Sequence, residues 1–287
     1  MDAFSVARNL ASIALFLVTS ESLAATVAAD QPSDITLVSA LLPGSRSVQV
    51  GATATVFGTM INASTDTIGT ACSVQPATDV PATFLYQTTD PATNALTGTA
   101  NAPVAIGPGV AQSFLLAFTP SAAFAPTQIA FSFSCTNATP AVTIAGVNTL
   151  LLSASTTPTP DLIALGATAS NDGIVDIPGS SGVGAFAVAT ANVGAASTIT
   201  ASANTGSATL PLTITTCQTV PTTGACMAAP SVSVATTVNA GDTPTFAIFV
   251  QGSGVVPFQP ATNRIFVQFQ DAGGAIRGST SVAVQTQ

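Results

Sequence analysis

Four cysteines carry the most readily interpreted chemistry in this 287-residue sequence. Cys72 and Cys135 are 63 positions apart, and Cys217 and Cys226 are nine positions apart. These spacings match no zinc-binding motif, and the chain contains no histidine, the other common zinc ligand. Because histidine and lysine are both absent, nothing in the sequence would activate a catalytic thiol. We therefore expect the cysteines to form disulfide bonds.

The expected pairing is Cys72 with Cys135 and Cys217 with Cys226. Each pair falls within one of two sequence repeats described below, which favours this pairing over the two alternatives that four cysteines allow. The longer separation would let a disulfide join an early strand to the central strand across a β-sandwich. In the loop-entropy model, the longer bond stabilises the fold by about 4 kcal/mol and the shorter by about 3 kcal/mol.

Other catalytic chemistry has few candidates. Without histidine the chain lacks the usual general base and the Ser-His-Asp arrangement, and without lysine it lacks Schiff-base chemistry. The remaining candidates are aspartates, which are scattered and lack the Asp-Thr-Gly-like setting or the aromatic sugar platforms of a carboxylate-pair glycosidase. We expect no enzymatic activity, no catalytic residues and no cofactor-binding residues.

Asp172 and Asp176, close to Asn171, offer oxygen ligands of the kind that calcium prefers. However, they do not form an Asp-x-Asp-x-Asp-Gly loop, and aspartates in turns more often accept hydrogen bonds from their own backbone. We expect no metal site.

The charge balance excludes two classes of partner. Charged residues make up 6% of the chain and the net charge is −8, so the few scattered arginines cannot neutralise the phosphates of a nucleic acid. The same balance disfavours attachment to anionic lipid. Hydrophobic residues make up 47% of the chain, which is enough to build packed cores.

Residues 1–29 have features of an export signal. An apolar run of eight residues, 11–18, is too short to span a bilayer and is followed by small residues typical of a cleavage site. No later stretch is long and apolar enough to cross a membrane. We therefore predict a signal peptide at 1–29 and a protein that is secreted, periplasmic or on the cell surface.

The rest of the chain follows a strand pattern that occurs twice. In residues 128–137, Ile129, Phe131, Phe133 and Cys135 alternate with small residues, as in a strand with one face on a core. Residues 263–271 repeat the pattern. Similar strands separated by Gly, Pro and Asn turns are expected at 34–38, 48–51, 53–62, 68–74, 82–87, 113–118 and 148–155, and again at 161–165, 174–179, 183–192, 197–203, 208–218, 245–250 and 279–286.

The fold class predicted from this repeat is all-β, with two tandem immunoglobulin-like β-sandwich domains. The predicted boundaries are 30–155 for the first domain, 156–160 for a Thr/Pro linker and 161–287 for the second domain. Two prolines favour an extended, semi-rigid linker.

Three shared features carry a family resemblance over about residues 34–287. Asn62 and Asn192 each end a long strand, the Gln-Thr-x-x-Pro loop at Gln87 is echoed by Gln-Thr-Val-Pro at Gln218, and each repeat closes with a Phe-rich hairpin. In these features the chain resembles tandem immunoglobulin-like modules of secreted or surface bacterial proteins. The resemblance implies a structural or adhesive role outside the cytoplasm, with a protein or cell-envelope component as partner.

The functional prediction is thus a non-enzymatic exported protein that acts as a tandem spacer or binding module. One alternative is a subunit of a surface structure that assembles by β-edge pairing, since threonine- and valine-rich strands with few charges are poorly protected against strand addition, and this would make it a homo-oligomer. Another is a carbohydrate-binding module, although the lack of tryptophan and the single tyrosine, Tyr86, count against stacking on sugars.

Overall fold

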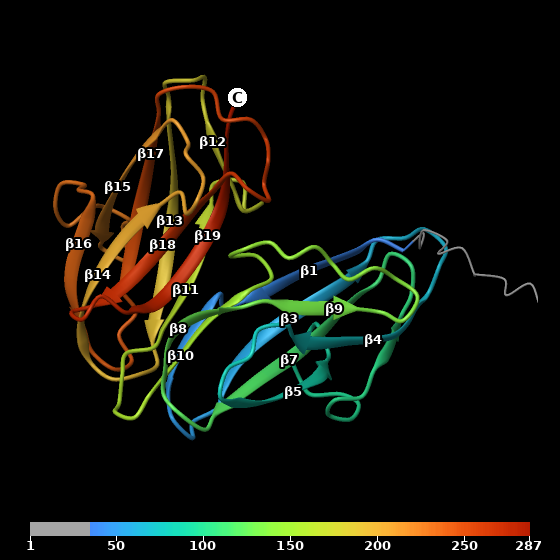
Figure 1. Cartoon of the computed structure of the whole chain (residues 1–287). Helices are drawn as coiled ribbons and strands as arrows, with labels where there is room; N and C mark the ends of the chain where they lie inside the picture. The colour runs from blue at the N-terminus through green and yellow to red at the C-terminus, as the bar shows by residue number, and fades with distance from the viewer. Residues whose placement is uncertain (1–34) are drawn as a thin grey trace, which may run out of the picture. The chain divides into compact units, whose positions relative to one another are not determined.

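The computed structural model describes residues 35–287 and shows an all-β protein, with no helix in that range (Figure 1). This confirms the all-β part of the predicted fold class. The predicted signal peptide, 1–29, and the first residues of the predicted first domain, 30–34, lie outside the described residues. Within the described range, no helix has the length and apolarity needed to cross a membrane.

The first half of the described chain contains ten strands in three sheets. The strands are β1 (Leu37–Leu42), β2 (Ser45–Gln49), β3 (Ala54–Asn62), β4 (Gly69–Pro76), β5 (Ala82–Thr89), β6 (Val104–Ile106), β7 (Ala111–Pro120), β8 (Phe124–Ile129), β9 (Phe131–Ser134) and β10 (Leu150–Ser155). Their sheet orders are β1-β3-β7-β5, β2-β10-β8 and β6-β4-β9. All neighbours are antiparallel except β2 and β10, which run parallel.

The second half contains nine strands in two sheets. The strands are β11 (Leu162–Thr168), β12 (Ile174–Ile177), β13 (Val183–Asn192), β14 (Ser197–Asn204), β15 (Leu212–Thr219), β16 (Ser233–Val238), β17 (Thr245–Gly252), β18 (Arg264–Asp271) and β19 (Ile276–Thr286). Their sheet orders are β11-β13-β17-β15 and β12-β19-β18-β14-β16.

The two halves use the same strand order. The four-stranded sheets correspond strand by strand, and the parallel pair β2 with β10 matches the parallel pair β12 with β19. In the first half, β8 and β9 together take the place of β18, which pairs with both β19 and β14. Residues Ser33–Gln287 nevertheless form one compact unit, so the division into two domains stays a prediction.

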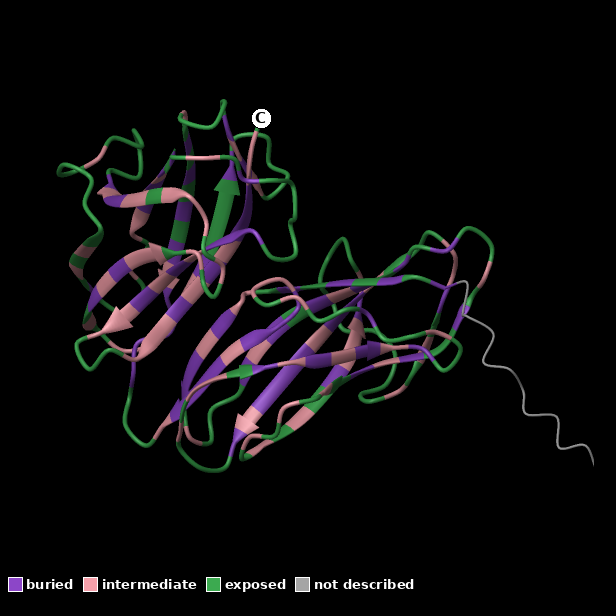
Figure 2. Ribbon diagram, turned by 45° about the horizontal axis from the view of Figure 1, so that its top comes forward, coloured by how far each residue is buried: buried purple, intermediate pink, exposed green. Residues whose placement is uncertain are grey.

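Alternating burial explains why these residues form strands that pack in layers. Along β3 and β13, every second side chain is buried and its neighbours face outward, as the striped ribbons of Figure 2 show. The buried residues form one apolar core in each half. The first core contains a phenylalanine cluster in which the Phe84 and Phe118 ring centroids are 4.8 Å apart, and in the second the Phe246 and Phe269 centroids are 5.2 Å apart.

The central strand predicted at 128–137 is interrupted at Ala130. There the backbone N–H donates to Thr78 Oγ1 at 3.1 Å and the carbonyl accepts from the Ala77 N–H at 2.8 Å. These bonds to a neighbouring turn divide the strand, so that β8 joins one sheet and β9 another. The sequence pattern also missed β6, which has only three residues, and β16, in which small residues and threonines fill most positions.

Candidate functional site

Both expected disulfide bonds are present, Cys72–Cys135 and Cys217–Cys226. The expectation that the first bond crosses the β-sandwich was wrong. Cys72 lies in β4 and Cys135 follows β9, the strand that pairs with β4 through Ser73 and Ser134, so the bond joins neighbours in one sheet and does not cross the sandwich. Their Cα atoms are 3.9 Å apart. The spacing of the cysteines in the sequence does not reveal the strand order. A bond within one sheet therefore could not be distinguished from a bond across the sandwich.

The second disulfide fixes a loop over the edge of a sheet. Cys217 lies in the edge strand β15, and Cys226 forms a bridge with Thr219 of the same strand. The Met227 N–H donates to the Gln218 carbonyl at 2.9 Å. The loop thus occupies backbone groups that the edge would otherwise present to another chain.

The corresponding strand β5 is covered in the same way without a disulfide. Thr97 donates its N–H to the Thr88 carbonyl at 2.8 Å, and Asn101 donates to the Tyr86 carbonyl at 2.7 Å. The Tyr86 hydroxyl donates to the Asn101 carbonyl at 3.2 Å, and this ring is buried, so it offers no platform for a sugar. At β5 and β15, strand addition would have to displace the chain's own loops.

The aspartates considered for calcium bind protein groups. Asp172 accepts from the Thr168 hydroxyl at 3.1 Å and from the Ile174 N–H at 2.9 Å, and Asp176 accepts from the Gln285 amide at 2.8 Å. Among the described residues, no group of three or more His, Cys, Asp or Glu side chains is placed to hold a metal ion.

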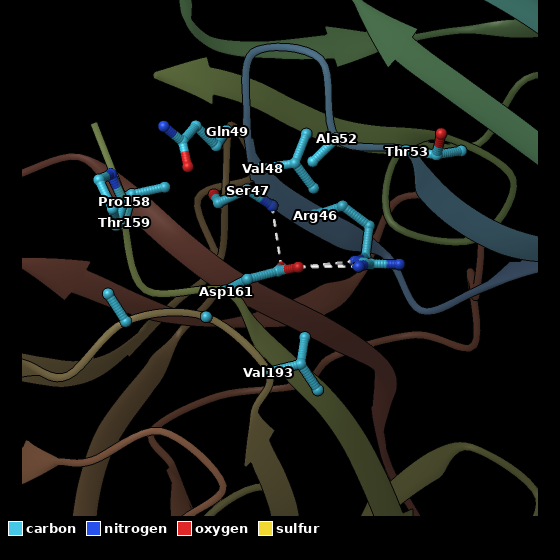
Figure 3. Close-up of a pocket in the computed structure, with 12 residues that line it drawn as sticks. Arg46, Ser47, Val48, Gln49, Ala52, Thr53, Pro158, Thr159, Asp161 and Val193 are labelled. Atoms are coloured by element: carbon cyan, nitrogen blue, oxygen red, sulfur yellow. Dashed lines mark hydrogen bonds and ion pairs between the residues drawn. The ribbon is translucent and has the colours of Figure 1, made fainter. Parts of the chain in front are cut away.

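A buried ion pair joins the two halves of the described chain (Figure 3). Asp161 follows the predicted linker, and its carboxylate accepts from Arg46 Nε and Nη2, each at 2.9 Å. Its other oxygen accepts from the Ser47 backbone N–H at 2.9 Å, and Arg46 Nη1 donates to the Thr55 carbonyl at 2.6 Å. The Asp161 and Arg46 side chains are only 4% and 11% exposed.

Burial and ion pairing shift the pKa of Asp161 in opposite directions. Burial raises the pKa of Asp161 above its ordinary value, while the charge of Arg46 and the N–H donors of Arg46 and Ser47 oppose this effect. The desolvation of both charges means that the pair adds little net stability, but a carboxylate left there without its arginine would be strongly unfavourable. The pair therefore connects β2 to the start of the second half.

Further hydrogen bonds surround this contact. Ser45 Oγ accepts from the Ser279 N–H at 2.6 Å, and Ser281 Oγ donates to the Gly146 carbonyl at 2.8 Å. A hollow of about 390 Å³ lies beside Arg46 and Asp161, but both side chains are already engaged in the bonds above. The geometry supports a structural joint in preference to a reactive site.

Sequence reasoning did not find this joint. Arg46 lies between the strands predicted at 34–38 and 48–51, Asp161 begins the strand predicted at 161–165, and 115 positions separate the two residues. Only the tertiary fold brings them together.

The outer faces of the two four-stranded sheets share an absence of charge. None of the eight strands in these sheets contains an Asp, Glu, Lys or Arg. On the sheet of the first half, five large apolar side chains are 38–57% exposed, and Leu42 is paired in register with Phe57 as Val38 is with Ile61. The five are Val38, Leu42, Phe57, Ile61 and Leu85. We call this the outer face of the first sheet.

Comparisons with known proteins are distant. No protein-family model matches the chain, and no curated protein matches its sequence. Solved structures with partial similarity include the secreted serine protease VesC from Vibrio cholerae, at 11% identity and a TM-score of 0.25, covering 78% of this chain and 48% of that one. This chain thus spans about half the length of the protease chain.

Two further structures are domains 5–6 of the S-layer protein SbsC and BcpA, the major pilin subunit of Bacillus cereus. The SbsC match has 11% identity and a TM-score of 0.24, and covers 88% of this chain and 99% of that chain. The BcpA match has 11% identity and a TM-score of 0.26, and covers 87% and 70%. At these values, none of the matches carries an inference about the role of this chain.

Proposed function

We propose that this chain is a non-enzymatic structural module of an exported protein, a spacer in which the two halves move as one body. The observation that carries the proposal is the Arg46–Asp161 pair, which places a buried ionic contact directly after the predicted linker. A linker meant to bend freely would not need such a contact, since separating the halves would expose both partners or leave one buried and unpaired.

Two other features support the proposal: the disulfides support a location outside the cytoplasm, and the partners of the arginines support a structural role. Disulfides persist in oxidising compartments, and this chain uses all four of its cysteines in two such bonds. Of the three arginines in the described range, Arg46 and Arg277 form ion pairs with aspartates, and Arg264 binds a hydroxyl and carbonyls.

Cell fractionation with intact-mass analysis tests the proposed compartment. We expect a species outside the cytoplasm that begins near residue 30 and gains about 4 mass units on reduction, one hydrogen for each of four thiols. Proteolysis of intact cells then separates surface exposure from periplasmic location. A full-length cytoplasmic chain with free thiols would overturn the proposal.

A second candidate function is self-assembly, with the outer face of the first sheet as the contact. The structure disfavours edge pairing at β5 and β15, where loops occupy the edges, but it leaves this face uncharged and apolar. From strand spacing and length, the face measures about 500 Å², so two copies would bury about 1,000 Å², near the lower limit for a specific interface. A second copy also brings no unpaired charge onto the face.

A further inference from the structure

Arg264, at the start of β18, is a buried cation with unusual partners. Its side chain donates from Nε and Nη2 to Ser281 Oγ at 3.1 and 2.9 Å, from Nη2 to the Ser281 carbonyl at 3.2 Å, and from Nη1 to the Pro260 carbonyl at 2.8 Å. All of these acceptors are neutral. The residue is 8% exposed, and burial lowers the pKa of its guanidinium below the ordinary value.

Arg264 differs from the other arginines of residues 35–287 because it has no carboxylate partner in that range. Arg46 pairs with Asp161 at 2.9 Å and Arg277 with Asp271 at 2.7 Å. A guanidinium has five N–H groups, and the four bonds above leave one on Nη1 without an acceptor among the described residues. A buried positive charge of this kind is normally compensated by a negative group.

A groove of about 490 Å³ opens over this arginine, a volume typical of small-molecule sites. Arg264, Phe266 and Gln268 line it from alternate positions of β18, because Ile265 and Val267 between them point into the core. Asn204, opposite Phe266 in the register, donates its amide to Gln268 Oε1 at 3.2 Å. The lining includes the hydroxyl side chains of Thr205 and Thr262, and no Asp or Glu.

Two glycines lie close to the Phe266 ring, and one of them, Gly206, lines the groove. Gly146 and Gly206 have positive φ angles of 74° and 62°, and a Cβ atom on either would lie 2.7 or 2.8 Å from a ring carbon. A side chain at either position would thus combine backbone strain with a clash. The absence of side chains at Gly146 and Gly206 therefore lets the backbone lie close to the ring.

We propose that this groove binds the carboxylate of a small hydroxylated acid. The planar guanidinium of Arg264 matches a carboxylate and would gain the opposite charge that the described protein groups do not supply. The second N–H of the Asn204 amide and the N–H groups of the Gln268 amide can donate to hydroxyl groups next to that carboxylate. The Thr205 and Thr262 hydroxyls already donate to the Ala208 and Gln259 carbonyls, and their oxygens can accept from those groups. A carboxylate with neighbouring hydroxyl groups occurs both in an open-chain hydroxy acid and in an acidic sugar. This binding proposal does not depend on the proposed spacer role.

The test is a titration of the ¹⁵N-labelled full-length protein with D-gluconate, D-galacturonate and neutral D-galactose. We expect saturable shifts of the backbone amides of Asn204, Gly206, Arg264 and Gln268 with an acid, and none with galactose. Stronger binding of gluconate would identify an open-chain acid as the ligand, and stronger binding of galacturonate an acidic sugar. No saturable binding of either acid, or equal binding of galactose, would overturn the proposal.

Variants identify the groups responsible. Arg264→Gln is expected to weaken binding by a factor of about 10 to 100, as loss of a charged hydrogen bond does. Because this change also removes bonds that support the fold, Gln268→Leu provides a second variant that leaves the bonds of Arg264 to Ser281 and Pro260 in place, and should weaken binding several-fold. Arg277→Gln, at the arginine paired with Asp271, is the matched control and should bind as the original chain does. Unchanged affinity in both groove variants would contradict the assignment.

Discussion

At the scale of single residues, the few charged side chains of this protein act mainly as structural contacts. Asp161 accepts from Arg46 and from the Ser47 backbone in a nearly dry setting, and Asp271 accepts from Arg277 and from the turn that it begins. Because only 6% of the residues are charged, each ion pair is a rare and specific structural contact. Composition alone predicted that reactive groups would be scarce, but it did not indicate which charges would meet.

Replacing Arg46 should be costly because it leaves the Asp161 carboxylate buried. We expect Arg46→Met to lower the free energy of unfolding by about 3 kcal/mol, measured by urea denaturation. The double variant Arg46→Met/Asp161→Asn removes the charge while keeping an oxygen for the Ser47 N–H, so it should recover part of the loss. A double variant less stable than Arg46→Met alone would contradict this explanation.

Asp271 should make stability depend on pH in acid. Its burial would raise the pKa of Asp271, but hydrogen bonds from Arg277, Ala275 and Gly273 and the charge of Arg277 together hold that pKa below the ordinary 3.8. Because the folded pKa is depressed, the stabilisation is complete above about pH 4 and is lost as the pH falls through the folded value. The pKa of Asp161 is raised, so its titration has the opposite sign.

We therefore expect thermal midpoints of the original chain to fall below pH 4, and those of Asp271→Asn to fall less over the same interval. The control for removing one negative charge elsewhere is Asp79→Asn, at an exposed aspartate. Parallel curves for the original chain and Asp271→Asn would show that Asp271 does not have this role.

At the scale of elements, the alternation of large and small residues was sufficient to predict most strands. Residues 183–192 form a strand with the predicted bounds, and 53–62 differ from β3 by one residue. The break at Ala130 could not be predicted, because it depends on hydrogen bonds from a turn about 50 residues earlier. The position of the Cys72–Cys135 bond could not be predicted either, because it depends on the pairing of β4 with β9, which the sequence does not reveal.

The two disulfides should stabilise the fold to different extents. Cys72→Ser/Cys135→Ser should cost about 4 kcal/mol and Cys217→Ser/Cys226→Ser about 3 kcal/mol, because the first bond closes a longer loop. Urea denaturation of the two double variants against the original chain measures both. A larger loss at the shorter loop would contradict the loop-entropy account.

The shorter disulfide has a second expected effect, on the sheet edge. Without Cys217–Cys226, the loop over β15 is held by backbone hydrogen bonds alone, and its opening exposes an unpaired edge. We expect the Cys217→Ser/Cys226→Ser variant to aggregate faster than Cys72→Ser/Cys135→Ser at equal fraction folded, measured by light scattering. The reverse order would mean that this loop does not protect the edge.

At the scale of the whole molecule, the outer face of the first sheet carries no charge although the protein has a net charge of −8. Repulsion between copies opposes assembly at low salt and is screened as salt is added. If the outer face of the first sheet is a contact between copies, sedimentation velocity should show association that grows with concentration and salt. Phe57→Asp, in the centre of the face, should abolish it.

Phe258→Asp is the control for this prediction, since Phe258 is 57% exposed but lies outside the eight strands of the four-stranded sheets. Equal loss of association in both variants would indicate nonspecific hydrophobic contact. A monomer at all concentrations would remove self-assembly from consideration and leave the spacer role untouched.

The central claim is that the two halves move as one body, and a distance distribution between them tests it most directly. Spin labels at Ser121→Cys and Ser180→Cys, two exposed positions in different halves, can be measured by pulsed electron spin resonance. The account predicts one narrow distribution, which broadens when Arg46→Met removes the joint. A broad distribution with Arg46 and Asp161 both in place would contradict it and would show that the halves move independently.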